Sequence, residues 1–337
     1  MTNVIIYGAT GYMGKLCAKR MRQEGLQPIL AARSNRVQTL AQELDCKSVV
    51  FGLDDAIAIE RALAGVALMV NLAGPFALTQ KPLIEACLAQ GVHYIDIAGE
   101  VNEMESAFVF DEAAKEKGIM LMPGSGFGVV PTDIVAAMAK ELLPDATRLT
   151  ILYATEGGAS RGTLKTVLKD IHRAGVKRVN GEFVAAQPAE SSMDFTVAEK
   201  SFTAVTNPWR ADLFTAGIST GIDDIQTYSV FPGFVVKMMK GRLVCLRNLM
   251  LNQLLRFLPE GPSEKQLQQG STYVMAIASN GKSDRSVALK GPEAYLFTAD
   301  CLRAVSQRVL QNDVKPGFQT PAIYGKGLLE GLNIEVY

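Results

Sequence analysis

The stretch that decides the fold is Val-Ile-Ile-Tyr-Gly-Ala-Thr-Gly-Tyr-Met-Gly, residues 4–14. Its first four residues predict a buried strand, and the helical spacing of residues 12–24 predicts a helix directly after it. In a strand–turn–helix that binds a dinucleotide, Gly8 allows the tight turn, Gly11 lets the backbone approach a pyrophosphate, and Gly14 lets the helix pack against the strand. The alternative is an ordinary strand–turn–helix with glycine at its corner.

Five further strand-and-helix units follow the first one. The strands are expected at 28–32, 48–51, 67–70, 94–97 and 119–122, and the helices near 35–44, 55–64, 78–90 and 103–117. Strands that are apolar on both faces and separated by helices indicate a parallel sheet covered on both sides. The predicted fold class is therefore α/β, a Rossmann-type doubly wound parallel sheet. This context favours the dinucleotide interpretation of the glycines.

The pattern changes after Pro123, where a second domain of α+β type is expected. Its predicted elements are a helix opened by Pro131, a strand over 147–155, a helix near 163–175, a hairpin of 271–279 and 285–290, a long helix over 293–311 and a short one over 321–331. The hairpin prediction rests on the turn residues Asn280 and Gly281 between its two strands.

Composition excludes several classes of protein. The 337 residues include 34 Lys and Arg and 34 Asp and Glu, so the formal net charge is zero, which argues against a nucleic-acid-binding protein. Five scattered cysteines without a CxxC pair and only two histidines argue against a disulfide framework and against a metal site, and for a reducing compartment. The N-terminus lacks the pattern of a signal peptide, so we expect a cytoplasmic protein.

The end of the second strand selects the cofactor. NAD-binding domains usually carry Asp or Glu there to bind the ribose 2′-OH, but no acidic residue occurs between Glu24 and Glu43. Arg33 and Ser34 follow the strand instead, and a guanidinium offers a planar fork of donors that suits a phosphate. We therefore expect NADP(H), with Arg33 on the 2′-phosphate. The alternative for Arg33 is a solvated surface position.

Two further loops are expected at the cofactor, because ligands of doubly wound sheets bind beyond the carboxyl ends of the strands. Residues 71–75 end the fourth strand, and Asp54 follows the third, where it would touch the adenine end or cap the next helix. The expected cofactor-binding residues are Gly8, Thr10, Gly11, Tyr12, Met13, Arg33, Ser34, Asp54, Asn71, Ala73, Gly74 and Pro75.

Several segments together carry a family resemblance. They are residues 8–14, 71–76, 86–87 with 91–100, 126–127 with 131–133, 157–158 with 162–164, 294–299, and 317 with 320–322. The chain resembles the saccharopine dehydrogenase-like oxidoreductases, in the branch that includes trans-acting enoyl reductases. The matching segments occur in a specific order and span almost the whole length.

The resemblance implies an NADP-binding domain over 1–125, to which a C-terminal helix over 318–337 returns, and a substrate and dimerisation domain over 126–317. Two departures from the family concern the substrate: residues 128–130 differ before Pro131, and Arg161 stands among residues that are usually small. At a helix N-terminus, Arg161 would bind an anionic group of the substrate or be a simple surface residue. The expected substrate residues are Phe127, Arg161 and Thr163.

Hydride transfer is the chemistry of the cofactor, so the protein must position it and supply a proton donor. We expect the donor beyond the carboxyl ends of strands four to six, and the candidates are Glu100, just past the fifth strand, and Tyr94 within it. Asp96 lies inside that strand and is expected to be a buried, hydrogen-bonded carboxylate. Tyr94 shares its strand face, which makes a core position the alternative for Tyr94.

Residues 231–258 contain basic residues and no acidic ones, and apolar residues from Leu243 to Phe257 recur at helical spacing. A basic amphipathic helix predicts a contact with an acyl substrate or a peripheral membrane association. The alternative is a helix packed on the substrate domain or at a homodimer contact.

The sequence therefore predicts an NADPH-dependent oxidoreductase that reduces a C=C (enoyl) or C=N bond of a small organic substrate, such as an acyl compound. Two alternatives stay open. One is an amino-acid-linked dehydrogenase of the saccharopine type, and the other is a non-catalytic NADP(H)-binding redox regulator.

Overall fold

The computed structural model describes residues 3–164, 171, 173–241, 249, 257 and 260–337. The chain forms two compact units. The first combines Met1–Val130 with Tyr295–Ile323, and the second combines Pro131–Ala294 with Tyr324–Tyr337.

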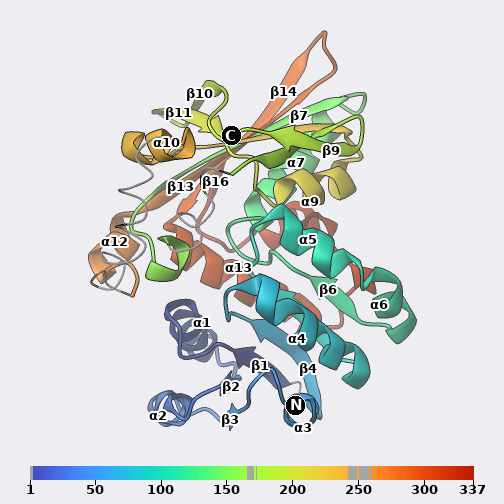
Figure 1. The fold of residues 1–337 in the computed structure, drawn as a ribbon, viewed down its shortest axis with the longest axis vertical. Coiled ribbons are helices and arrows are strands. Elements are labelled where there is room, and N and C mark those ends of the chain that lie inside the picture. Colours follow the sequence, from blue (N-terminus) through green and yellow to red (C-terminus); the bar gives the residue numbers. More distant parts are fainter. Residues whose placement is uncertain (1–2, 165–170, 172, 242–248, 250–256, 258–259) are drawn as a thin grey trace. The chain divides into compact units, whose positions relative to one another are not determined.

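The first unit is built on a parallel sheet in the strand order β15-β6-β5-β4-β1-β2-β3 (Figure 1). Its strands are β1 (Asn3–Tyr7), β2 (Ile29–Ala32), β3 (Ser48–Val50), β4 (Val66–Asn71), β5 (His93–Asp96), β6 (Met120–Met122) and β15 (Gly317–Phe318). The six strands before β15 have the order of a doubly wound dinucleotide-binding fold, in which the direction of winding reverses between β1 and β4. The predicted fold class is confirmed.

Helices connect the strands of this sheet. They are α1 (Tyr12–Gln23), α2 (Arg36–Glu43), α3 (Ala56–Leu63), α4 (Phe76–Gln90), α5 (Val101–Phe108) and α6 (Asp111–Lys117), with α13 (Ala294–Leu310) added from the C-terminal part. Ile5, Leu68 and Ile95 are fully buried in the central strands, as expected for a parallel sheet covered on both faces.

One helix of the first unit differs from its prediction. The helix expected over 103–117 is two helices, α5 and α6, separated at Val109 and Phe110. Asp111 in the first turn of α6 accepts the backbone N–H of Phe318 in β15 at 2.7 Å. This long-range bond ties α6 to the edge of the sheet, and the local helical pattern contains no sign of it.

The second unit is built on a mixed sheet, which has nine strands among the described residues. The strands are β7 (Arg148–Glu156), β8 (Gly175–Val179), β9 (Glu182–Ala186), β10 (Ser192–Val197), β11 (Lys200–Thr206), β12 (Asp224–Ser229), β13 (Ser271–Ser279), β14 (Asp284–Pro292) and β16 (Glu335–Val336). The helices of this part are α7 (Val130–Leu142), α9 (Asp212–Thr220), α10 (Gly233–Met239) and α12 (Glu264–Gln269). β12 and β7 pair in parallel, and the other strands pair antiparallel.

The strand expected over 147–155 and the hairpin after residue 271 are confirmed as β7 and as β13 with β14. In the hairpin turn, Asn280 Oδ1 accepts the N–H groups of Lys282 and Ser283 at 2.9 and 2.8 Å. The helix expected near 163–175 lies mostly outside the described residues.

The C-terminal segment is not the single helix that the sequence suggested for 318–337. It forms a 3₁₀ helix, η2 (Pro321–Leu328), which is interrupted at Gly325 (φ 55°), and then the short strand β16. β16 pairs antiparallel with β14. A glycine with positive φ and a strand partner far away in the sequence both prevent a continuous helix here.

Candidate cofactor and catalytic site

The glycine-rich turn after β1 brings three backbone segments into contact. Gly8 has φ +84°, and a Cβ on it would lie 2.8 Å from the backbone N of Ala73. A Cβ on Gly14 would lie 2.3 Å from Gly8 O and 2.6 Å from the Cα of Ala9. Both positions therefore require glycine, Gly8 for the turn beside the loop after β4 and Gly14 for the packing of α1 on that turn.

Gly11 is the N-cap of α1 and has no side chain that could cap the helix. The first turn of α1 contains no acidic residue, and Gly11 is exposed, with Thr10, Tyr12 and Met13 partly exposed around it. The first N–H groups of a helix have no acceptor within the helix, and they carry the positive end of its dipole. The arrangement suits an anion such as a pyrophosphate.

Arg33 and Asp54 lie near Tyr7, at the carboxyl end of β1. Burial raises the pKa of Tyr7, the charge of Arg33 lowers it, and the charge of Asp54 raises it further, which places both charges near the Tyr7 ring. Arg33 is exposed, and no other described residue forms an ion pair or hydrogen bond with its side chain. Ser34 follows it and is partly exposed.

Asp54 does not cap the helix that follows it, which was the alternative role predicted for it, because the neighbouring residue caps α3. Asp55 is the N-cap of α3, and its Oδ1 accepts the N–H of Ala58 at 2.9 Å. Asp54 is exposed beside that cap.

The loop after β4 is shaped by Asn71, which is fully buried. Asn71 Oδ1 accepts the N–H of Ala73 at 3.0 Å, and Asn71 Nδ2 donates to Thr79 Oγ1 at 3.0 Å and to Tyr94 Oη at 2.9 Å. Thr79 Oγ1 in turn donates to Ala73 O at 2.8 Å. Asn71 thus fixes the loop from inside, and it leaves Gly74 and Pro75 exposed, with Ala73 partly exposed.

Asp96 connects the loops after β5 and β6. Its Oδ1 accepts the N–H groups of Ala98 (2.9 Å) and Gly124 (3.0 Å), and its Oδ2 accepts Gln80 Nε2 and Tyr94 Oη, both at 2.8 Å. Complete burial raises the pKa of Asp96, and these four hydrogen bonds oppose the increase. The expectation of a buried, hydrogen-bonded carboxylate at Asp96 is confirmed.

Tyr94 lies inside this network and is 0% exposed. Its hydroxyl accepts from Asn71 and donates to Asp96, and burial raises its pKa well above the usual value. Tyr94 therefore holds Asn71 and Asp96, and with them the loops after β4 and β5, in place.

Glu100 is the N-cap of α5, and Glu103 lies in its first turn. Glu103 Oε2 accepts the N–H groups of Gly99 at 3.2 Å and Glu100 at 3.3 Å. Burial, and after it the charges of Glu100 and Asp96, raise the pKa of Glu103 to about 8. Sequence reasoning missed Glu103, although an acidic residue three positions after a helix start is a known capping pattern.

The residues expected at the substrate fall into different units. Phe127, in the first unit, is 6% exposed, stacks on Phe297 with ring centroids 5.6 Å apart, and donates its N–H to Thr298 Oγ1 at 3.3 Å. Arg161 and Thr163, in the second unit, are exposed at the start of a helix of which only the first residues are described.

The basic segment at 231–258 lies largely outside the described residues. In its described part, α10 buries Val235, Met238 and Met239. Over the described chain, no helix is both long and apolar enough to cross a membrane, and no group of three His, Cys, Asp or Glu side chains could hold a metal ion.

Comparison with known proteins identifies the first unit. Residues 4–122 match the family model described as saccharopine dehydrogenase NADP binding domain. Residues 4–122 therefore resemble the NADP-binding domain of the saccharopine dehydrogenases. The resemblance predicted from the sequence is confirmed, and the family is one of oxidoreductases with an NADP-binding domain.

The relatives include two named groups. A Mycobacterium tuberculosis protein provisionally named trans-acting enoyl reductase is 29% identical over 187 residues, which cover 51% of this chain and 45% of that protein. The match thus spans about half the length of that relative. The saccharopine dehydrogenase-like oxidoreductase of Bos taurus is 21% identical over an alignment that covers 92% of this chain and 89% of the relative.

A solved structure shares the fold of this chain. The apo saccharopine dehydrogenase (L-Glu forming) of Saccharomyces cerevisiae superposes with a TM-score of 0.67 at 10% identity, and the superposition covers 100% of this chain and 99% of that structure. At this identity the likeness supports the fold alone.

Proposed function

We propose that the protein is an NADPH-dependent oxidoreductase that reduces a C=C or C=N bond of a small organic substrate. The observation that carries the proposal is the combination of an α1 N-terminus without a side-chain cap and, at the end of β2, an exposed Arg33 whose side chain has no partner among the described residues. The first accommodates a diphosphate and the second a ribose 2′-phosphate. The NADP-binding family of residues 4–122 supports the same cofactor.

The cofactor, when bound, supplies the hydride, and the residues of this chain bind and orient it. Gly8 and Gly14 keep the turn tight, and Gly11 lets the diphosphate approach the start of α1, next to Tyr12 and Met13. The loop from Ala73 to Pro75, which Asn71 holds from inside, supports the nicotinamide side. Asp54 lies toward the adenine side.

The carboxyl pair of Glu100 and Glu103 is the proposed proton source. Because the pKa of Glu103 is about 8, its carboxyl group holds a proton at neutral pH, as a general acid requires. Tyr94 is a weaker candidate, because its hydroxyl is fully buried and already has two hydrogen-bond partners.

Two substrate classes follow from the relatives. The relatives named trans-acting enoyl reductases favour an enoyl compound. The relative named saccharopine dehydrogenase-like oxidoreductase favours an imine of an amino compound. Phe127, Arg161 and Thr163 stay predictions for substrate contact.

The proposal is tested by following NADPH oxidation by the purified protein with crotonyl-CoA and, separately, with a cyclic imine. We expect turnover with one class, and a decrease in kcat of about 100-fold for Glu103→Gln without a change in the NADPH dissociation constant. Glu105→Gln, an exposed carboxylate on the same helix, is the matched control. Unchanged kcat in both Glu100→Gln and Glu103→Gln would exclude the pair, and the absence of turnover with every enoyl and imino compound would favour a non-catalytic redox regulator.

A further inference from the structure

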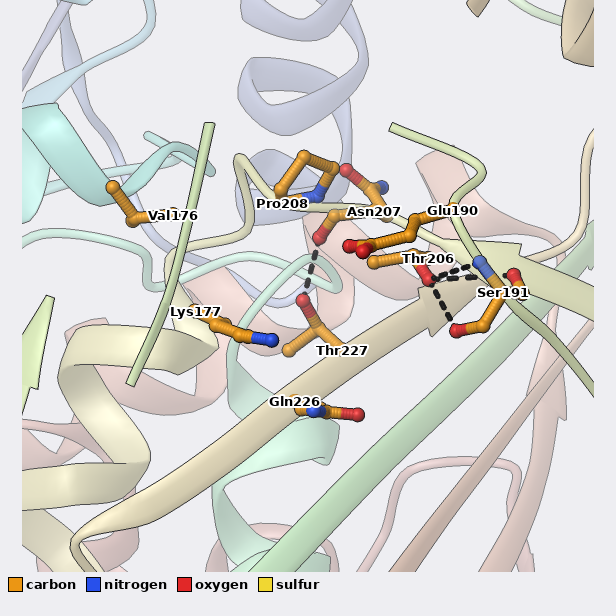
Figure 2. A pocket seen from close by; sticks show the side chains of 9 residues that line it. All are labelled: Val176, Lys177, Glu190, Ser191, Thr206, Asn207, Pro208, Gln226 and Thr227. Carbon is orange, nitrogen blue, oxygen red and sulfur yellow. Dashed lines mark hydrogen bonds between the residues drawn. The ribbon is translucent and has the colours of Figure 1, made fainter. Parts of the chain in front are cut away.

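The edge of β12 in the second unit carries a gap between two strands. β11 pairs with β12 only at Tyr228 and Ser229, and β8 pairs with it only at Ile225. Gln226 and Thr227 lie between these pairings and have neither strand as a ladder partner. A cavity of about 200 Å³ opens at this gap, which we call the β12 notch (Figure 2).

The floor of the notch is formed by Asn207 and Thr227, which are joined by backbone and side-chain hydrogen bonds. Asn207 N donates to Thr227 O at 2.9 Å, and Thr227 Oγ1 donates back to Asn207 O at 2.6 Å. The N–H of Val176 in β8 donates to Pro208 O at 2.8 Å. The segment 207–208 thus bridges β12 and β8. Because Asn207 and Thr227 are 6% and 2% exposed, the floor is a fixed part of the fold.

Opposite charges face each other across this floor. Figure 2 shows Lys177 extending from β8 toward Thr227, and the Glu190 carboxylate extending toward the same region from the facing loop. Neither side chain has an ion-pair or hydrogen-bond partner in the described part of the chain. Ser191 and Thr206 in the same wall bond each other at 2.8 Å, so Lys177 and Glu190 are the charged groups of the lining that have no partner among the described residues.

A second hollow of the same sheet shows the opposite arrangement. It measures about 960 Å³ and is lined by Lys200, Tyr273, Lys290 and Glu335 among others. There Lys200 pairs with Glu156, and Lys290 pairs with Glu335 at 3.6 Å. Both lysines of this hollow thus have carboxylate partners, whereas Lys177 of the β12 notch has none among the described residues.

We propose that the β12 notch binds a small zwitterion of the α-amino acid class. The carboxylate of the ligand pairs with Lys177 and its ammonium pairs with Glu190, since charge-assisted hydrogen bonds are the strongest that such groups form. A volume near 200 Å³, roughly that of six or seven water molecules, limits the ligand to a short side chain. The proposal does not depend on the redox function, because no residue of the notch belongs to the cofactor site.

The test is isothermal titration of the full chain with glycine, L-alanine and L-serine, alongside acetate and ethylammonium as half-ligands. We expect saturable binding of at least one zwitterion and none of the half-ligands. Lys177→Met and Glu190→Gln should each weaken that binding by about tenfold or more. Lys282→Met, an exposed lysine in the β13–β14 turn, is the matched control and should bind as the wild type does.

Two outcomes would overturn the proposal. One is the absence of heat with every zwitterion at millimolar concentration. The other is binding that survives in both Lys177→Met and Glu190→Gln, which would place the ligand elsewhere in the molecule. Circular dichroism of both variants checks that they are folded, and since both side chains are at least partly exposed, we expect native spectra.

Discussion

Asp96 in the first unit and Glu190 in the second are carboxylates at the rims of two sheets, and their surroundings differ completely. Asp96 is fully buried and accepts four hydrogen bonds, whereas Glu190 is exposed and has no partner among the described residues. A charge satisfied on every side holds loops in place, and a charge left without a partner is available to a ligand. The comparison separates groups that position a site from groups that bind.

The same distinction applies within the first unit. Asn71 and Tyr94 point inward and bond each other, so they shape the loops at the carboxyl edge of the sheet. Arg33 points outward and forms no ion pair or hydrogen bond with the described residues. Arg33 is therefore available to the cofactor, and the buried network supports the loops beside it.

Among the substitutions considered, Asp96→Asn is expected to lower the free energy of unfolding the most. An amide has one acceptor oxygen, so at least one pair of the present donors loses its acceptor, and we expect the free energy of unfolding to fall by about 3 kcal/mol. Urea denaturation measures this change. The control is Asp194→Asn, an exposed carboxylate that accepts from Thr203 Oγ1, for which we expect a change within about 0.5 kcal/mol. Equal losses of unfolding free energy in the two variants would show that the four hydrogen bonds of Asp96 do not stabilise the fold.

The second effect concerns how the free energy of unfolding depends on pH, through the titration of Glu103. Since its pKa is raised from 4.5 to about 8 in the folded protein, the folded state binds more protons than the unfolded chain between these values. The stability contributed by the protonated carboxyl is complete below about pH 4.5 and is lost as the pH rises through about 8. Glu103→Gln, which cannot titrate, should remove this decline. Parallel stability curves for the two proteins between pH 5 and 9 would contradict the assignment.

The smallest effects are expected in the β12 notch without ligand. Because Lys177 and Glu190 have no ion-pair or hydrogen-bond partner among the described residues, Lys177→Met and Glu190→Gln should each change the free energy of unfolding by less than about 0.5 kcal/mol. Thermal unfolding of the two variants measures this. A loss of about 2 kcal/mol in either one would show that the side chain is structural, and the contrast with Asp96 would disappear.

The strands of the first unit could be predicted from the sequence because a parallel sheet covered on both faces needs continuous apolar runs. The gap in the second sheet could not, since it depends on β8 and β11 meeting the same edge of β12 from segments far apart in the chain. The break between α5 and α6 has a similar origin in the bond from Phe318 to Asp111.

In the candidate site too, local features could be predicted from the sequence, and contacts between distant segments could not. The glycine turn and Arg33 were predicted because their chemistry is local to one strand and one turn. Thr79 and Gln80 were not, because on α4 they look like ordinary helix residues, and only the fold brings them to Asn71 and Asp96. Glu103 required knowledge of how deeply the start of α5 is buried.

The central claim is that the first unit binds a nicotinamide dinucleotide through the turn at Gly8–Gly14 and the phosphate of NADPH through Arg33. The most direct measurement is calorimetric titration of NADPH and NADH into the wild-type protein and into Arg33→Gln. We predict tighter binding of NADPH than of NADH to the wild type, and a loss of about 10- to 100-fold in Arg33→Gln for NADPH alone. Equal losses for the two nucleotides, or no binding of either one to the wild type, would contradict the account.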